Sequence, residues 1–193
     1  MKNVLVLVTN GFADWEAAYV TAEVNKPGTG YQVKTIAVDL HPKTSMGGFN
    51  VLPDYSLQDF SFDLPFSMLI IPGGTGWKSE QDQRLKQLVQ YCVDHQISVA
   101  AICDATIFLG KNGFLDHSKH TSNTLPYLKQ HAPDYKGEQN YIDAQSVSGD
   151  DLITANGSGA VEFSRDILSR LNVLEGEALN RWYDIFKVGF VKG

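Results

Sequence analysis

Residues 97–110 read Ile-Ser-Val-Ala-Ala-Ile-Cys-Asp-Ala-Thr-Ile-Phe-Leu-Gly. The first six form a short apolar run that predicts a buried strand, and the segment from Asp104 to Gly110 predicts a helix. Cys103 lies at the junction, where a sharp strand-to-helix turn presents a side chain to a cleft. The neighbouring amides and the helix N-terminus favour the thiolate, which is the reactive form of cysteine. We therefore predict that Cys103 is a nucleophile or a redox centre.

Strand-like and helix-like segments alternate along the rest of the chain. The predicted strands cover residues 4–8, 31–38, 67–71 and 97–102, and the predicted helices cover 13–25, 79–95, 104–110, 159–171 and 175–186. Shorter strands are predicted at 51–52 and 119–122, a strand pair at 135–148 and 151–154, and a loop at 41–48. This alternation is typical of an α/β fold with helices on both faces of a parallel sheet. We expect one domain over residues 1–193, with 175–193 as an extra C-terminal helix.

The composition limits the class of protein. The chain has 193 residues, 43% of them hydrophobic, which is enough for one sizeable core. Its net charge of -6 and pI of about 5.3 argue against a nucleic-acid partner. No stretch has the roughly 20 apolar residues of a membrane span, and the N-terminus lacks a signal-peptide pattern. We expect a cytoplasmic protein with no membrane partner.

The two cysteines, Cys92 and Cys103, fit a reducing compartment better than a disulfide scaffold. Cys92 falls on the apolar stripe of its predicted helix and is expected in the core. No CxxC or HxxxH pair is present, so a structural zinc site has no support from the sequence. We expect neither a metal nor another cofactor.

Three segments follow predicted strands, at the ends where ligands bind in open α/β sheets. They are residues 10–16, 72–76 and 103–104. The amide of Asp104 and the backbone at Gly73–Gly74 could hold the oxyanion that forms when a thiolate attacks a carbonyl. Glu16 is the best-placed carboxyl to orient the thiol or to move its proton.

Each of these residues also has a plain structural interpretation. Cys103 could be a small buried core residue, Gly73–Gly74 a simple turn, and Glu16 a solvated helix residue. Trp15 and Trp77 flank the same segments, where they could line a pocket, cover the cysteine or form a dimer contact.

Taken together, these segments resemble the ThiJ/PfpI superfamily, within the class I glutamine amidotransferase-like fold. The matching residues are Val4–Val8, Gly11, Asp14-Trp15-Glu16, Leu69–Gly74, Val99–Cys103 and Leu152–Gly159 with Glu162. The resemblance implies a flavodoxin-like, three-layer α/β sandwich with a mostly parallel central sheet. It also implies that Cys103 is the nucleophile-elbow cysteine and that Glu16 hydrogen-bonds its thiol. Gly74 and Asp104 match the residues whose amides form the oxyanion hole.

The chain departs from the family pattern at the positions where histidines are expected. Hydrolytic members commonly have His directly after the cysteine, where this chain has Asp104, and others take a His from a later loop, where it has Asn123. Glutamine amidotransferases use a late His-x-Glu pair, which is absent. The five histidines are His41, His95, His117, His120 and His131. An amidotransferase triad is therefore disfavoured and a protease-like triad is unsupported.

Asp104 has two interpretations. Its carboxylate could hold a substrate water or act as the acid or base that His supplies elsewhere. Alternatively, it could only cap the helix, where an anion is favourable. In either case a carboxylate beside the thiol tends to raise the pKa of that thiol.

Three functions remain open from the sequence. The first is a hydrolase or lyase with a small carbonyl or amide-like substrate. The second is a non-enzymatic redox or stress-response protein, or a chaperone, that uses an oxidisable Cys103. The third is a binding module that kept the turn and lost the chemistry. Family members are commonly homodimers, and Phe60, Phe62 and Phe66 are compatible with a contact patch.

Overall fold

In the computed structural model, which describes residues 1–62, 64–77 and 83–190, a seven-stranded sheet has the order β5-β2-β1-β6-β7-β9-β8. Its strands are β1 (Lys2–Leu7), β2 (Tyr31–Ala37), β5 (Tyr55–Ser56), β6 (Phe66–Ile71), β7 (Ser98–Ile102), β8 (Ser146–Ser148) and β9 (Leu152–Ala155). Neighbouring strands are parallel except for β8, which runs antiparallel to β9. The predicted mostly parallel, flavodoxin-like α/β fold is confirmed.

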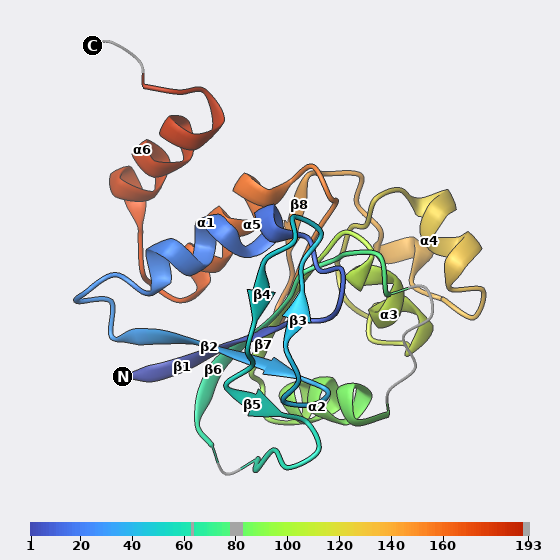
Figure 1. The fold of residues 1–193 in the computed structure, drawn as a ribbon. Coiled ribbons are helices and arrows are strands. Elements are labelled where there is room, and N and C mark those ends of the chain that lie inside the picture. Colours follow the sequence, from blue (N-terminus) through green and yellow to red (C-terminus); the bar gives the residue numbers. More distant parts are fainter. Residues whose placement is uncertain (63, 78–82, 191–193) are drawn as a thin grey trace.

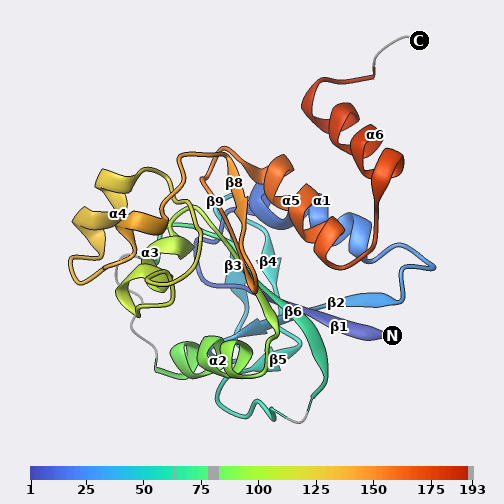
Figure 2. The same cartoon turned by 180° about the vertical axis from the view of Figure 1, so that it is seen from behind.

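Helices cover both faces of this sheet (Figures 1 and 2). One face packs against α1 (Asp14–Val24) and α5 (Ala160–Arg170), which lie side by side, with α6 (Gly176–Lys187) packed beyond them. The other face packs against α2 (Gln83–Asp94) and α3 (Ala105–Lys111), and α4 (Leu125–His131) packs on α3. Within the described ranges, none of these helices has the length and apolar character needed to cross a membrane.

The continuous apolar run of β1 follows from this arrangement. Val4 and Val6 point into the core that contains α1 and α5, whereas Leu5 and Leu7 point into the core that contains α2 and α3. Successive side chains of a strand face opposite sides, so a strand covered on both faces needs apolar residues at every position.

Several predicted elements are wrong in detail. The expected loop at 41–48 contributes to a hairpin of β3 (Lys43–Thr44) and β4 (Asn50–Val51), with the second strand one residue before the expected 51–52. Residues 119–122 make only a single bridge, between His120 and Tyr141. Of residues 135–148, only the last three form a strand, and α4 was not predicted at all. The first four residues of the helix predicted at 79–95 lie outside the described residues.

The hairpin has a physical cause that local sequence does not show, because it depends on hydrogen bonds to a distant segment. In the hairpin, the backbone N–H of Gly11 donates to Thr44 (2.7 Å) and that of Met46 donates to Phe12 (2.8 Å). These bonds fix the hairpin beside the loop that joins β1 to α1. Local sequence pattern carries no signal for such partners.

The sheet topology brings together the carboxyl ends of β1, β6 and β7. From β1 the chain enters α1 on one face, whereas from β6 it enters α2 on the other. Connections that diverge to opposite faces leave a crevice between neighbouring strands, where ligands bind in such folds. The three segments selected from the sequence meet there.

Candidate functional site

Cys103 occupies a strained turn between β7 and α3. Its φ of 59° lies in the left-handed region, which costs a non-glycine residue roughly 1–3 kcal/mol. The backbone holds this conformation on both sides: Cys103 N–H donates to Ala155 O (2.9 Å), and Cys103 O accepts from Thr106 N–H (3.1 Å). The Thr106 hydroxyl donates to the same oxygen at 2.6 Å. The surrounding bonds therefore maintain a turn that leaves the thiol partly exposed.

Glu16 lies in the first turn of α1, and its side chain is buried beside the thiol. Its Oε2 accepts a hydrogen bond of 2.5 Å from the backbone N–H of Gly73. Its Oε1 has no partner with hydrogen-bond geometry in the described part of the chain. A Cβ at position 73 would lie 2.8 Å from Oε2 and 2.7 Å from Cys103 Cβ, so glycine is needed for the two groups to come together.

Burial raises the pKa of the Glu16 carboxyl to about 7. The negative charge of Asp104 acts in the same direction, whereas the Gly73 amide and the Cys103 thiol oppose the rise. A carboxyl with a pKa near neutrality can both accept and return a proton under physiological conditions. The predicted contact between Glu16 and Cys103 is thus present in the structure, and its electrostatics suit proton transfer.

The thiol itself is not poised as a thiolate. Burial, together with the negative charges of Glu16 and Asp104, raises the pKa of Cys103 to about 12. The side chain of Asn123 and the backbone N–H of Asp104 donate to the sulfur and oppose the rise. The Asp104 amide favours the thiolate, as expected, but desolvation and two carboxylates outweigh it.

Asn123 connects the thiol to Asp104. Its Nδ2 lies 3.5 Å from Cys103 Sγ and 3.0 Å from Asp104 Oδ1. Its Oδ1 accepts a hydrogen bond of 2.8 Å from Gly157 N–H. Since the oxygen faces an N–H donor, the amide NH₂ must face the sulfur and the carboxylate. Asn123 thus occupies the place expected for a histidine and contacts the thiol, but it cannot act as a base.

Asp104 binds side chains instead of capping α3. Its carboxylate makes no capping hydrogen bond to the helix, so the cap interpretation fails. It accepts from the Tyr127 hydroxyl at 3.0 and 3.2 Å, in addition to Asn123. Sequence reasoning missed Tyr127 together with α4. A signal was present: Thr124 caps the helix through its hydroxyl, and Pro126 lies in the first turn.

Gly74 sits at a close backbone crossing. Its φ is 142°, and a Cβ there would lie 2.2 Å from the carbonyl oxygen of Gly11. The crossing uses bonds from Thr75 N–H to Gly11 O and from Ala13 N–H to Gly73 O, both 3.1 Å. No acceptor for the Gly74 N–H occurs among the described residues. This amide is therefore available, as an oxyanion donor requires.

Other candidate residues belong to the core. Cys92 is fully buried in α2, as predicted. Trp77 is also buried: its indole N–H donates to Pro72 O (2.9 Å) and its ring packs on Phe108. Trp77 therefore neither lines a pocket nor forms a dimer contact, whereas Trp15 remains half exposed.

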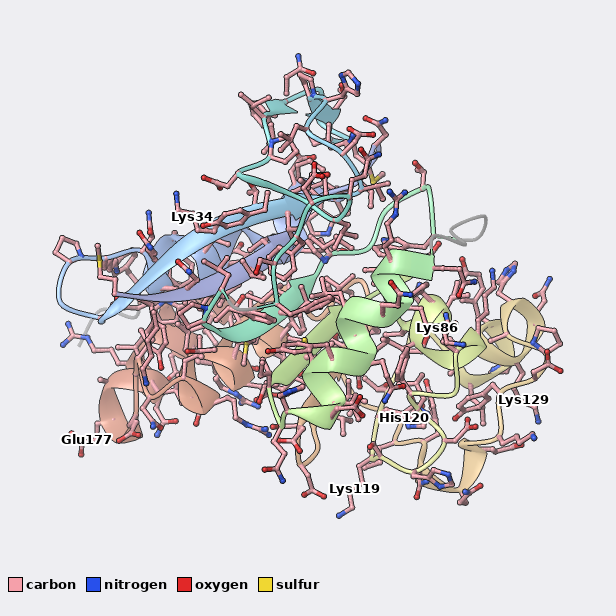
Figure 3. The ribbon with its side chains drawn as sticks, turned by 90° about the horizontal axis from the view of Figure 1, so that it is seen from below. Lys34, Lys86, Lys119, His120, Lys129 and Glu177 are labelled. Atoms are coloured by element: carbon pink, nitrogen blue, oxygen red, sulfur yellow. The ribbon has the colours of Figure 1, made fainter. Side chains whose placement is uncertain are left out.

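None of the five histidines forms a hydrogen bond with Cys103 within the described chain. His120 is completely buried, with Nδ1 2.7 Å from Ser118 O and Nε2 2.6 Å from the Tyr135 hydroxyl. Its neighbour Lys119 extends outward from the same loop (Figure 3). No group of three metal-ligating side chains occurs among the residues that the structure describes.

The chain resembles known proteins over most of its length. The model of the DJ-1/PfpI family matches residues 2–170. The chain is 33% identical to the uncharacterized protease YoaZ of Bacillus subtilis, covering 96% of this chain and 91% of that protein. It is 32% identical to the uncharacterized protease YdeA of the same organism, covering 98% and 93%.

Solved structures give the same result for the fold. A thiJ/pfpI family protein from Bacillus anthracis superimposes with a TM-score of 0.88 at 37% identity, covering 96% of this chain and 90% of that one. A DJ-1 superfamily protein from Agrobacterium tumefaciens superimposes with a TM-score of 0.86 at 34% identity, covering 97% and 98%.

Proposed function

The chain belongs to the DJ-1/PfpI family, and from this premise we propose that it is a cysteine-dependent hydrolase or lyase acting on a small carbonyl or amide-like substrate. Cys103 is the nucleophile and Glu16 is its proton partner. The single observation that carries the proposal is the buried Glu16 carboxyl beside the thiol, with a pKa of about 7.

The resting state requires activation of the thiol during attack. Because the pKa of Cys103 is raised, the thiol keeps its proton at neutral pH. As the sulfur–carbon bond forms, the thiol proton passes to the Glu16 carboxylate and the carbonyl electron pair moves to the oxygen. General-base catalysis of this kind contributes about 10²–10⁴-fold to a rate.

The backbone supplies the groups that would stabilise the oxyanion. The amide of Gly74 has no acceptor in the described chain, and the amide of Asp104 follows the nucleophile directly. Donors fixed in place before the reaction stabilise a developing negative charge effectively. With an amide substrate, the intermediate then collapses by breaking the carbon–nitrogen bond. Glu16 returns its proton to the departing nitrogen, and water hydrolyses the thioester.

This route needs no histidine. The word protease in the names of the two Bacillus subtilis relatives is compatible with amide hydrolysis. Among the described residues, however, no histidine forms a hydrogen bond with Cys103. Asn123 holds the position that a catalytic histidine would take and cannot carry a proton. A small substrate with a good leaving group or an electrophilic carbonyl therefore fits better than a peptide.

Turnover of a panel of small aldehydes, amides and isonitriles tests the proposal. Cys103→Ala is expected to abolish turnover while the thermal unfolding temperature stays close to that of the unmodified protein. Glu16→Gln is expected to lower kcat by about a hundredfold or more. The control is Cys92→Ala, which removes the other thiol from the core and should retain turnover wherever it is folded. Turnover that survives Cys103→Ala would sink the proposal.

A second candidate is a redox role, favoured by the donors around the sulfur. Asn123 and the Asp104 amide already donate to Sγ, and a protonated Glu16 adds a third donor for an oxidised sulfur. The raised pKa of Cys103 argues against it, since the thiolate is the form that is oxidised. Intact mass after mild peroxide separates the two: selective oxygen addition at Cys103 without turnover supports the redox role. A thiol adduct without turnover or oxidation supports a binding module.

A further inference from the structure

The side chains around the thiol carry negative charge that no cation of the described residues balances by an ion pair. Asp104 accepts hydrogen bonds from Tyr127 and Asn123, which are neutral donors. No ion pair of Asp104 occurs within the ranges that the structure describes. The hydrogen bonds fix the position of the carboxylate and leave its charge in place.

The charge also lies close to the reacting atom. Asn123 Nδ2 bridges Cys103 Sγ (3.5 Å) and Asp104 Oδ1 (3.0 Å), so a substrate carbon bonded to the sulfur lies near the carboxylate. The charged groups that act on the thiol are Glu16 and Asp104, and both are acidic. A cleft lined by one sign of charge attracts ligands of the opposite sign and repels those of the same sign.

We propose that Asp104 selects substrates by charge, so that the site takes neutral or amine-bearing carbonyl compounds and rejects those that carry a carboxylate or phosphate near the reacting carbon. This inference rests on the proposed function and names the substrate class for it. Tyr127 is a positioning residue, because it holds the carboxylate in place. Asn123 holds the same carboxylate and also contacts the sulfur.

Other roles for Asp104 fit the geometry less well. Its side chain does not cap α3. Both of its oxygens accept hydrogen bonds from Tyr127, and one also accepts from Asn123, which suits the ionised form and not a proton donor. The role that fits the geometry of Asp104 is that of a fixed negative charge beside the nucleophile.

Charged thiol reagents test the inference without knowledge of the substrate. We would measure the rate at which Cys103 reacts with two methanethiosulfonates of similar size, one bearing trimethylammonium and the other sulfonate. In each case a disulfide forms at Cys103, the reagent's sulfur–sulfur bond breaks, methanesulfinate leaves and the thiol proton goes to solvent. The ratio of the two rates cancels the reactivity of the thiol itself. Peptide mass spectrometry assigns the modification to Cys103 and not to Cys92.

A pH of 6 isolates the effect of Asp104, because Glu16 is then mostly protonated. A negative charge about 6 Å from the charged group of each reagent attracts the cation and repels the anion by about 0.7 kcal/mol in water. The two effects add, so the ratio of the cation's rate to the anion's rate should be about tenfold higher for the protein than for 2-mercaptoethanol. Partial burial of Asp104 increases this ratio. Asp104→Asn should bring the ratio to within about threefold of the small thiol. The matched control is Asp151→Asn, which removes an equal charge from the turn before β9. This turn lies at the amino ends of the parallel strands, away from Cys103 at the carboxyl end of β7, so the ratio should not change.

Two outcomes would overturn the inference: a ratio for the unmodified protein equal to that of the small thiol, or a high ratio that persists in Asp104→Asn. The salt dependence is a second measurement on the unmodified protein, in which 0.5 M salt should reduce the ratio, since salt screens a partly exposed charge. Failure of the proposed function gives a different result: the reagents discriminate by charge, yet no carbonyl or amide compound of either charge is turned over.

Discussion

Replacing Glu16 by Gln tests the electrostatics on which the site depends. Glutamine has the shape of a protonated glutamate. Its amide oxygen can accept the hydrogen bond from Gly73 N–H, and its NH₂ takes the place of Oε1, which has no partner in the described chain. The variant therefore represents Glu16 locked in its neutral form, and only the unmodified protein changes its charge at this position with pH.

The magnitude follows from the pKa of Glu16, which burial raises from 4.5 to about 7 on folding. Between these values the folded protein binds more protons than the unfolded chain, so the free energy of unfolding falls as pH rises. The stabilisation is fully present below pH 4.5 and is lost as pH rises through 7. A pKa difference of roughly 2.5, at about 1.4 kcal/mol each, gives a loss of about 3 kcal/mol.

Urea denaturation at several pH values between 4.5 and 8 measures this loss. Subtracting the unfolding free energy of Glu16→Gln from that of the unmodified protein cancels the other titrating groups. As pH rises across this range, the unmodified protein should lose about 3 kcal/mol of unfolding free energy relative to Glu16→Gln. Glu177→Gln, which removes a carboxyl from the first turn of α6, gives the baseline for losing one acidic residue. A difference that stays constant with pH would refute the raised pKa and, with it, the role of Glu16 as base.

Two further substitutions test the packing around the thiol. In Gly157→Ala, the new Cβ would lie 2.8 Å from Cys103 Sγ and 3.3 Å from Asn123 Oδ1. Alkylation of Cys103 by iodoacetamide should therefore slow by about tenfold, and the free energy of unfolding should fall by about 1–3 kcal/mol. An unchanged alkylation rate would contradict this geometry. Trp77→Phe removes a buried hydrogen bond to Pro72 O, so the free energy of unfolding in urea should fall by about 1–2 kcal/mol while kcat stays the same. A large loss of kcat would instead place Trp77 in the site.

The sequence was sufficient for the parts of the site that depend on local pattern. The apolar run before Cys103 and the helix after it define the turn, and the structure gives that turn the strained φ of 59°. Glu16 and Gly74 lie in the segments that follow β1 and β6, and parallel strands bring such segments to one edge of the sheet.

Contacts between distant segments could not be read in the same way. Asn123 is 20 residues from Cys103 and reaches it only because Gly157, on a third segment, fixes its amide. The contact of Tyr127 with Asp104 depends on α4, a short helix whose position is set by packing on α3. Local sequence indicated that Asp104 raises the pKa of Cys103, but the net change is a balance between burial, two carboxylates and two donors that only the structure shows.

The burial of Glu16 both lowers the stability of the protein and allows Glu16 to act as a base. A carboxyl buried to 1% exposure, with one oxygen unpartnered in the described chain, destabilises the fold once it is ionised. A neutral amide of the same shape would avoid that cost. Yet only the ionised form can take the proton of a thiol whose own pKa is raised, so the pH range in which Glu16 destabilises the protein is the range in which it can act as a base. Turnover should therefore rise with pH and level off above about pH 7 while stability falls. Oxidation of a thiol with a pKa of about 12 would instead keep rising with pH, because the thiolate is the form that is oxidised.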